Sequence, residues 1–217
     1  MTGPAHGRLT RRALASLSLV VLAASCSGSG YQYVKDSTST AFFKLPTSWA
    51  LFDEDQILSS DLVSLSPQSQ QSVAQALWMV AFDANGTPSL THVLSAGSQQ
   101  PAGFAQVRPL GSQERDTFSL STIRNALFNV DGTSGTGSGV EVLSTSDVVL
   151  TGGFHGLRVE YNVPEGTDYL TVNQIGVVDP QTSTLYLFAI GCEAHCYLDN
   201  QDAIDQIANS WTVKEPS

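Results

Sequence analysis

Residues 157–163, LRVEYNV, alternate between apolar and polar side chains. Successive side chains of a β-strand point to opposite faces of the sheet, so the alternation predicts a half-buried strand. The side chains expected to face the core are Leu157, Val159, Tyr161 and Val163. Those expected to face solvent or a partner strand are Arg158, Glu160 and Asn162. Gly152-Gly153 predicts the turn that leads into this strand.

A long hairpin and a helix are predicted to follow this strand. Residues 169–178 and 184–190 are expected to pair around a turn at residues 179–182 (DPQT). The last helix is expected over about residues 200–211, with Asp199 as its N-cap. The residues expected on its buried face are Ile204, Ile207, Ala208 and Trp211.

The chain before residue 157 is predicted to mix strands with helices. The expected elements are a strand over 41–49, a helix from Ser66-Pro67 to Ala76, strands over 77–83 and 89–95, a helix over 119–128, a flexible loop over 131–139 and a strand over 140–150. Asn85-Gly86 favours a tight hairpin, so residues 77–83 and 89–95 are expected to pair. This order predicts an α+β domain with an antiparallel β-sheet flanked by helices.

Two short motifs lie at the ends of the predicted domain. Leu45-Pro46-Thr47-Ser48-Trp49 closes the first strand, and residues 204–213 (IDQIANSWTV) cover the last helix. With these motifs the layout resembles the PsbP-like (Mog/PsbP) fold and, among its members, the LpqN-type bacterial lipoproteins. The resemblance implies a single PsbP-like domain over residues 41–217 and a history of binding roles. It assigns no catalytic residue.

The first 25 residues have the pattern of an export signal. Arg8, Arg11 and Arg12 precede an apolar run over residues 13–24, which is too short to cross a bilayer as a helix. Small residues then lead to Cys26, and this arrangement resembles the lipobox of bacterial lipoproteins. The resemblance implies cleavage before Cys26, a diacylglycerol on its thiol and acylation, for example by palmitate, of the new amino group. A plain secreted protein with a chance cysteine is the alternative.

The predicted anchor sets the location and the domain boundaries. Acyl chains on Cys26 would hold the protein at the extracytoplasmic face of the cell membrane. Residues 26–40 are polar and rich in Gly and Ser at their start, so they are expected to form a flexible tether before a body that begins near Ala41. Residues 10–14 also resemble a twin-arginine signal, so the export route stays open between that route and the general secretory one.

Charge excludes one class of partner. Three of the ten basic residues lie among the first twelve positions, which leaves 7 basic and 20 acidic residues, a net charge of −13, after the signal is removed. Such a surface repels phosphate backbones, so no nucleic-acid partner is expected. The expected partners are the membrane, through the anchor, and an unidentified envelope protein, glycan or lipid ligand.

Cys192 and Cys196 form the local cluster that could carry chemistry. In an exported protein a disulfide between them is the simplest interpretation, and it would close the loop between the last strand and the last helix. A metal site would have at most three ligands here, with His195 as the third. A redox-active pair is a further alternative, although the spacing differs from the C-x-x-C motif of oxidoreductases.

The histidines, acidic residues and tryptophans outside this cluster do not form a recognisable catalytic or metal-binding motif. His92 and His155 fall on predicted strands, where a lone histidine is usually a packed or edge residue. The acidic triplet at residues 53–55 lacks the glycine and the alternation of a calcium loop, so a solvated turn is expected. Trp49, Trp78 and Trp211 are expected in the core. No nucleophile elbow, zinc motif, P-loop or dinucleotide fingerprint is present in the sequence, and no cofactor or metal is expected.

Two hypotheses about function follow. The first is a membrane-anchored, non-catalytic binding or accessory module of the cell envelope. The second is an envelope hydrolase or transferase whose catalytic residues are dispersed along the chain. A deep pocket that holds His92 or His155 beside carboxylates would favour the second hypothesis, whereas an open, uncharged groove on one sheet face would favour the first.

Overall fold

Three long antiparallel strands at the C-terminal end of the chain form the centre of the fold. In the computed structural model these strands are β7 (His155–Glu165), β8 (Asp168–Val178) and β9 (Thr184–Glu193). The structure describes residues 30–62, 66, 68–70, 73, 77–94, 98–132 and 139–215. The signal sequence and Cys26 therefore lie outside the described residues.

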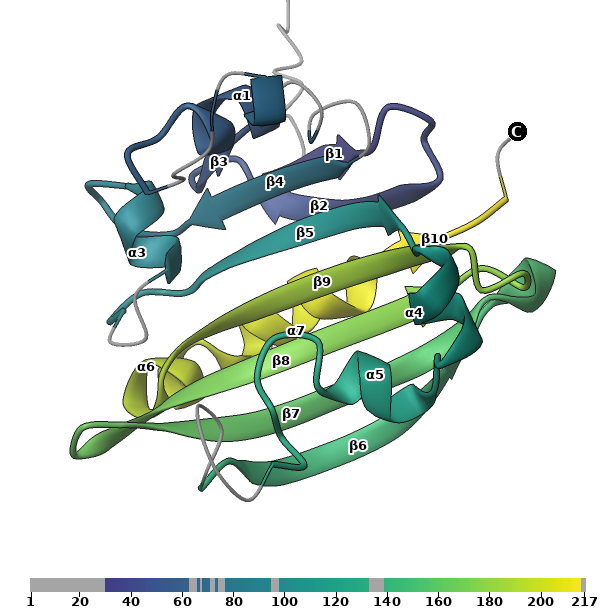
Figure 1. The fold of residues 1–217 in the computed structure, drawn as a ribbon. Helices are drawn as coiled ribbons and strands as arrows, with labels where there is room; N and C mark the ends of the chain where they lie inside the picture. Colours follow the sequence, from purple (N-terminus) through teal and green to yellow (C-terminus); the bar gives the residue numbers. More distant parts are fainter. Residues whose placement is uncertain are drawn as a thin grey trace, which may run out of the picture.

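The central strands belong to a seven-stranded antiparallel sheet with the order β3-β4-β5-β9-β8-β7-β6 (Figure 1). Its other strands are β3 (Ala50–Phe52), β4 (Trp78–Asp83), β5 (Ala102–Pro109) and β6 (Glu141–Val149). A second sheet has the order β1-β2-β10 and consists of β1 (Tyr31–Lys35), β2 (Ala41–Pro46) and β10 (Thr212–Val213). The predicted antiparallel α+β class is confirmed.

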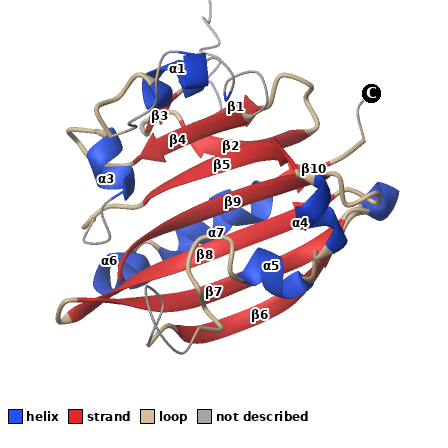
Figure 2. Cartoon of the chain, in the orientation of Figure 1, coloured by secondary structure: helices blue, strands red, loops and turns tan. Residues whose placement is uncertain are grey.

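Short helices flank the large sheet (Figure 2). They are α1 (Glu54–Leu58), α3 (Leu90–Leu94), α4 (Ser112–Asp116), α5 (Leu120–Arg124), α6 (Ala194–Asp199) and α7 (Gln201–Ser210), with a 3₁₀ turn, η1, at Thr151–Gly153. Figure 1 shows α7 on one side of the sheet and α4 and α5 on the other. No helix in the described part of the chain is long and apolar enough to span a bilayer.

The large sheet separates two hydrophobic cores. One core contains Phe188 and Ile190 of β9 and packs the sheet against α7 and the inner face of β1-β2-β10, which supplies Phe43 and Val213. The other core contains Ala189, the β9 residue between them, and is covered by α5 and the residues that follow it. The alternation along β9 therefore assigns odd-numbered and even-numbered residues to different cores.

Most of the elements expected in the second half of the chain are present in the structure. Leu157, Val159, Tyr161 and Val163 are buried, as the alternation predicts. The hairpin between β8 and β9 and the strand before η1 are also confirmed. Asp199 is not the N-cap of the last helix, however, because it ends α6 and Asn200 precedes α7. The chain forms two short helices there, where one was expected.

The expected hairpin at Asn85-Gly86 is wrong. Residues 90–94 form α3 instead of a strand, and β4 pairs with β3 and β5. The carboxylate of Asp83 accepts hydrogen bonds from the backbone N–H groups of Asn85 and Ser89, both at 2.9 Å, and holds the chain in a wider loop. β5 was missed because its residues 102–105 are mostly small.

Two further expectations about the first half need correction. Residues 31–35, which were assigned to the tether, form β1 and pair with β2, so the folded body begins about ten residues earlier than Ala41. The helix expected over 119–128 is shorter and forms α5. Most of the helix expected over 66–76 lies outside the described residues, but Ser66 Oγ does accept the Ser69 N–H at 3.2 Å, as an N-cap does.

Candidate functional site

A pocket of about 280 Å³ opens on the side of the large sheet that carries α3 and α5. Its lining residues come from α3, the loop before β5, strands β5, β8 and β9, and the segment after α5. They are His92, Val93, Ser98, Ala102, Gly103, Phe104, Leu127, Phe128, Leu170, Val172, Ala189, Ile190 and Gly191. The volume is about twice that of a cavity that accepts a benzene ring.

Small residues on neighbouring strands leave room for the pocket. Ala102 of β5 lies opposite Gly191 of β9, and Gly191 in turn lies opposite Val172 of β8. Ala189 is the next residue of β9 on the same face. A Cβ atom at position 191 would lie 2.4 Å from the backbone oxygen of Thr171, so the close approach of β8 and β9 requires glycine there. The pocket floor is therefore sheet backbone and methyl groups.

The wall on the α5 side is held by a buried hydrogen-bond chain. The Tyr161 hydroxyl donates to Gln174 Oε1 at 2.9 Å, and Gln174 Nε2 donates to the backbone oxygen of Ile123 in α5 at 2.5 Å. Phe128 packs edge-on against the Tyr161 ring, with ring centroids 5.9 Å apart. Burial in this apolar region raises the pKa of Tyr161 far above its usual range. The phenol is thus a fixed neutral donor that positions the wall.

His92 is the titratable residue of the pocket lining. Its Nδ1 atom lies 3.0 Å from Oδ2 of Asp83, whose side chain is fully buried. Asp83 also accepts from two backbone N–H groups, so its carboxylate acts as an acceptor in all three contacts. Nδ1 of His92 is therefore the donor in this pair, and Nε2 is the ring atom left for a ligand.

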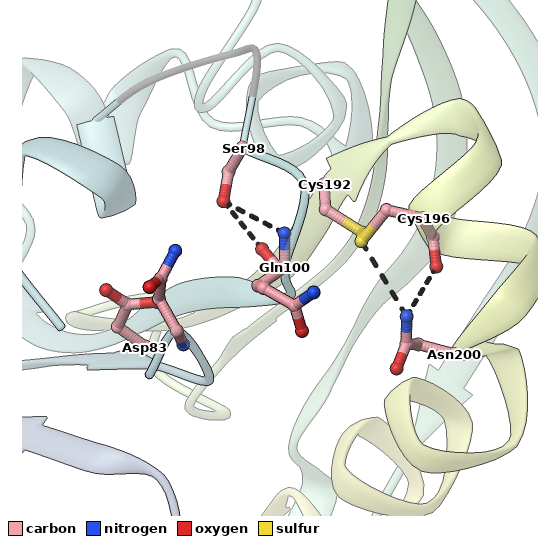
Figure 3. The surroundings of a disulfide bond; sticks show 7 residues. Asp83, Ser98, Gln100, Cys192, Cys196 and Asn200 are labelled. Atoms are coloured by element: carbon pink, nitrogen blue, oxygen red, sulfur yellow. Dashed lines mark hydrogen bonds between the residues drawn. A yellow bond between two sulfur atoms is a disulfide. The ribbon is translucent and has the colours of Figure 1, made fainter. Parts of the chain in front are cut away.

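Ser98 is the other polar side chain in the lining. It is buried, and its Oγ donates to the backbone oxygen of Gln100 at 2.6 Å (Figure 3). The backbone of the same residue is also held, since the Glu193 N–H donates to the Ser98 oxygen at 2.9 Å. In the described part of the chain Ser98 makes no hydrogen bond with His92. Among the described residues, no hydroxyl makes the contact with the His92 ring that the nucleophile of a catalytic triad makes.

The predicted disulfide is confirmed next to the pocket floor. Cys192 follows Gly191 in β9 and is bonded to Cys196 in α6, with Cα atoms 5.9 Å apart (Figure 3). Asn200 Nδ2 donates to the Cys196 backbone oxygen at 2.8 Å. Both cysteines are buried, and the bond fixes the step from β9 into α6. The neighbouring His195 is exposed.

The remaining predicted residues lie away from the pocket. His155 begins β7, with Nδ1 3.2 Å from the Gly153 oxygen. Asp53 caps α1 by accepting the Gln56 N–H, so the acidic triplet starts a helix and is not a solvated turn. Trp211 is buried, while Trp49 and Trp78 are half-buried against the same core. Among the described residues no cluster of His, Cys, Asp and Glu could hold a metal ion.

Most of the pocket-lining residues are not predicted as a site by the sequence. The sequence predicts Asp83 at the end of a strand and gives it no role. It predicts His92 on a strand, whereas His92 lies on α3. Leu127 and Phe128 were expected in a helix and instead follow one. The available signal was the small residues Ala102, Ala189 and Gly191 in otherwise apolar strands, because small side chains there mark a close approach or a void.

The comparisons with known proteins concern the fold. No protein-family model and no curated protein matches the sequence. Solved structures that are similar include the cyanobacterial PsbP of Synechocystis (15% identity, 87% of this chain and 96% of the other, TM-score 0.49) and a protein of unknown function from Pseudomonas aeruginosa (10%, 87% and 100%, 0.44). A third is the Ran-binding protein Mog1p of Saccharomyces cerevisiae (8%, 84% and 95%, 0.46).

At these identities the likeness is one of fold, and no functional argument follows from it.

Proposed function

We propose that this protein is a membrane-anchored, extracytoplasmic binding module that holds one small, largely apolar ligand in the pocket over β5, β9 and β8. The pocket itself is the observation that supports the proposal. Its walls are aliphatic and aromatic, its floor is backbone and methyl groups, and His92 is its titratable residue. Concave apolar sites with few polar groups are typical of small-molecule binding.

The contacts around the pocket favour binding over catalysis. Ser98 is the hydroxyl residue of the lining, and its proton is directed to the backbone oxygen of Gln100. The residues next to Ser98 in the pocket are held by the sheet and by the disulfide. The geometry of the pocket is therefore fixed before a ligand enters. A preformed apolar site spares the ligand the cost of ordering its receptor.

The ligand proposal is tested by titration with a neutral naphthalene-based fluorophore, whose two fused rings suit the volume of the pocket. We expect saturable binding of one probe per chain, with an increase in probe fluorescence. His92→Gln should keep binding and change affinity by less than tenfold, because the apolar walls supply most of the contact. Linear, non-saturating uptake by the wild-type chain would contradict the proposal.

A second candidate function rests on the Asp83–His92 pair. A buried carboxylate that orients a histidine at a pocket is an arrangement that hydrolases use, and the hydrolase hypothesis calls for this feature. An ester of p-nitrophenol with a short acyl chain is the test substrate. Turnover that is lost in both His92→Gln and Ser98→Ala would establish the second candidate. Equal rates in the wild type and both variants would rule it out.

The anchor is proposed on the sequence pattern of residues 1–26. Cys26→Ala should abolish metabolic labelling by palmitate and move the protein out of the membrane fraction or leave it unprocessed. A Cys26→Ala protein that still takes up label and still sediments with membranes would show that the anchor is not at this cysteine.

A further inference from the structure

The outer face of the β1-β2-β10 sheet differs in charge from the rest of the protein. All three lysines of the chain lie in this sheet or directly beside it: Lys35 is in β1, Lys44 in β2 and Lys214 directly after β10. All three are exposed, and none makes an ion pair in the part of the chain that the structure describes. The strands themselves contain no Asp or Glu.

Aromatic rings lie beside these lysines on the same face. Lys44 Nζ is 5.6 Å from the centroid of the Tyr33 ring, and Tyr33 is 65% exposed. Lys214 Nζ is 5.6 Å from the centroid of the Phe42 ring. The register pairs Tyr33 with Lys44 and Lys35 with Phe42 across β1 and β2. We call this group, Tyr33, Lys35, Phe42, Lys44 and Lys214, the basic face.

The acidic residues that flank the basic face are turned away from it. Asp36 follows β1, but its carboxylate is buried and accepts from the Ala41 N–H at 2.8 Å and from the Thr38 N–H at 3.2 Å. Glu215 follows Lys214, and its side chain lies against Gly152 of the 3₁₀ turn. The basic face is therefore a local positive region on a strongly acidic body.

We propose that the basic face is a docking surface for the anionic surface of the membrane that carries the anchor. The proposal rests on the proposed acylation of Cys26. Four residues separate Cys26 from Tyr31, so the Cα atom at the start of β1 can stand at most about 18 Å from that of the acylated cysteine. The short connection therefore limits how far the start of β1 can move from the anchor, whatever path the four residues take.

The chemistry of the basic face fits a bilayer surface. Lysines near an anionic leaflet are attracted to its headgroups, while tyrosine suits the boundary between headgroups and acyl chains. At physiological ionic strength charges more than about 8 Å apart are largely screened, so the distant carboxylates do not cancel this local attraction. Each lysine is expected to raise the population of the docked orientation roughly fivefold.

Docking on the basic face would direct the pocket away from the membrane. The inner side of β1-β2-β10 packs on the core that contains Phe188, whereas the pocket is on the side of Ala189. The large sheet therefore lies between the basic face and the pocket. In this orientation the pocket opens toward the extracytoplasmic space, where it can exchange ligand with other envelope components.

The test uses the full, acylated chain in vesicles. Protein in neutral phosphatidylcholine vesicles is compared with protein in vesicles rich in phosphatidylglycerol, after mass spectrometry has shown the acyl groups on Cys26. Hydroxyl-radical oxidation is then measured at Tyr33 and at Tyr169, which is 44% exposed and belongs to the large sheet. We expect Tyr33 oxidation to fall at least fivefold in the anionic vesicles at low salt, to recover at high salt, and to leave Tyr169 unchanged.

A matched pair of triple variants assigns the effect to the lysines. The protection of Tyr33 should be lost in the triple variant that carries Lys35→Gln, Lys44→Gln and Lys214→Gln. The control is a triple variant that makes the same change in net charge on β5, α4 and α5, through Arg108→Gln, Arg115→Gln and Arg124→Gln. It should leave the protection of Tyr33 intact. Three results would each overturn the proposal. They are equal oxidation of Tyr33 in both kinds of vesicle, equal effects of the two triple variants, and absence of the acyl groups.

Discussion

His92 Nδ1 lies 3.0 Å from Asp83 Oδ2, and this contact joins the end of β4 to the first turn of α3. The same carboxylate accepts the backbone N–H groups of Asn85 and Ser89. Asp83 is completely buried, so these contacts replace its hydration. One carboxylate thus forms the loop before α3 and holds the Nδ1 side of His92, a residue of the pocket lining.

Removing this carboxylate should destabilise the fold. Asp83→Ala leaves the Asn85 and Ser89 N–H groups and His92 Nδ1 without their acceptor, and we expect a loss of about 2–3 kcal/mol in the free energy of unfolding. Urea unfolding followed by circular dichroism measures the change. The control is Asp61→Ala, at an exposed carboxylate, which should change stability by less than about 0.5 kcal/mol. Equal effects of the two substitutions would show that Asp83 does not organise the loop.

The two faces of the sheet should respond differently to added volume. Ala189 borders the pocket, whereas Ala105 is fully buried in the opposite core, where Phe43, Phe82 and Phe188 pack together. Ala189→Leu should therefore change stability by less than about 1 kcal/mol, and Ala105→Leu should cost about 1–3 kcal/mol through overpacking. Thermal unfolding compares the two variants. A larger loss for Ala189→Leu would mean that the pocket is not open space.

Reduction of the disulfide should have a moderate effect. The bridge closes a loop of only a few residues, so the chain-entropy relation gives about 2 kcal/mol of stabilisation. We expect reduction to lower the melting temperature by a few degrees while the domain stays folded at room temperature. Mass spectrometry of unreduced, alkylated protein provides the check. Alkylation of Cys192 and Cys196 in protein from the envelope would contradict the pairing.

Alkaline pH should destabilise the fold through two tyrosines. Burial raises the pKa of Tyr161, and burial together with the nearby Glu160 carboxylate raises that of Tyr197. Both phenols stay neutral in the fold, whereas in the unfolded chain they ionise near pH 10. Their contribution is therefore fully present below about pH 10 and is lost as the pH rises further.

The tyrosine prediction is measured by unfolding in urea at a series of alkaline pH values. The free energy of unfolding of the wild type should fall as the pH rises above about 10. Tyr161→Phe should have lower stability at neutral pH, because Gln174 loses a donor, but a shallower alkaline slope. An unchanged slope in this variant would show that Tyr161 does not contribute to the alkaline loss.

The sequence predicts the fold where local pattern and burial agree. The sequence predicts β7 because its apolar side chains face a core and its polar side chains do not. It predicts the disulfide because export and the short spacing of the two cysteines favour their pairing. The loop after β4 was wrong because Asn85-Gly86 has a strong hairpin preference locally, which the tertiary contacts of Asp83 override.

The pocket could not be predicted for a different reason. A cavity is empty space, and this one is left where Ala102 of β5 meets Ala189 and Gly191 of β9. The register that brings these two strands together is fixed by long-range pairing. His92 enters the site through α3, whose helical form depends on the same loop. Patterns along one segment carry no information about such a meeting of distant segments.

The affinity of the neutral naphthalene-based probe for wild-type protein and for Ala189→Leu tests the central claim most directly. The leucine side chain would fill the pocket between β5 and β8 without touching the basic face or the opposite core. We expect one saturable site in the wild type, at least a tenfold loss of affinity in Ala189→Leu, and no loss in Val149→Ser, whose side chain is 78% exposed on β6. Equal affinities of the wild type and Ala189→Leu would contradict a binding function for this pocket.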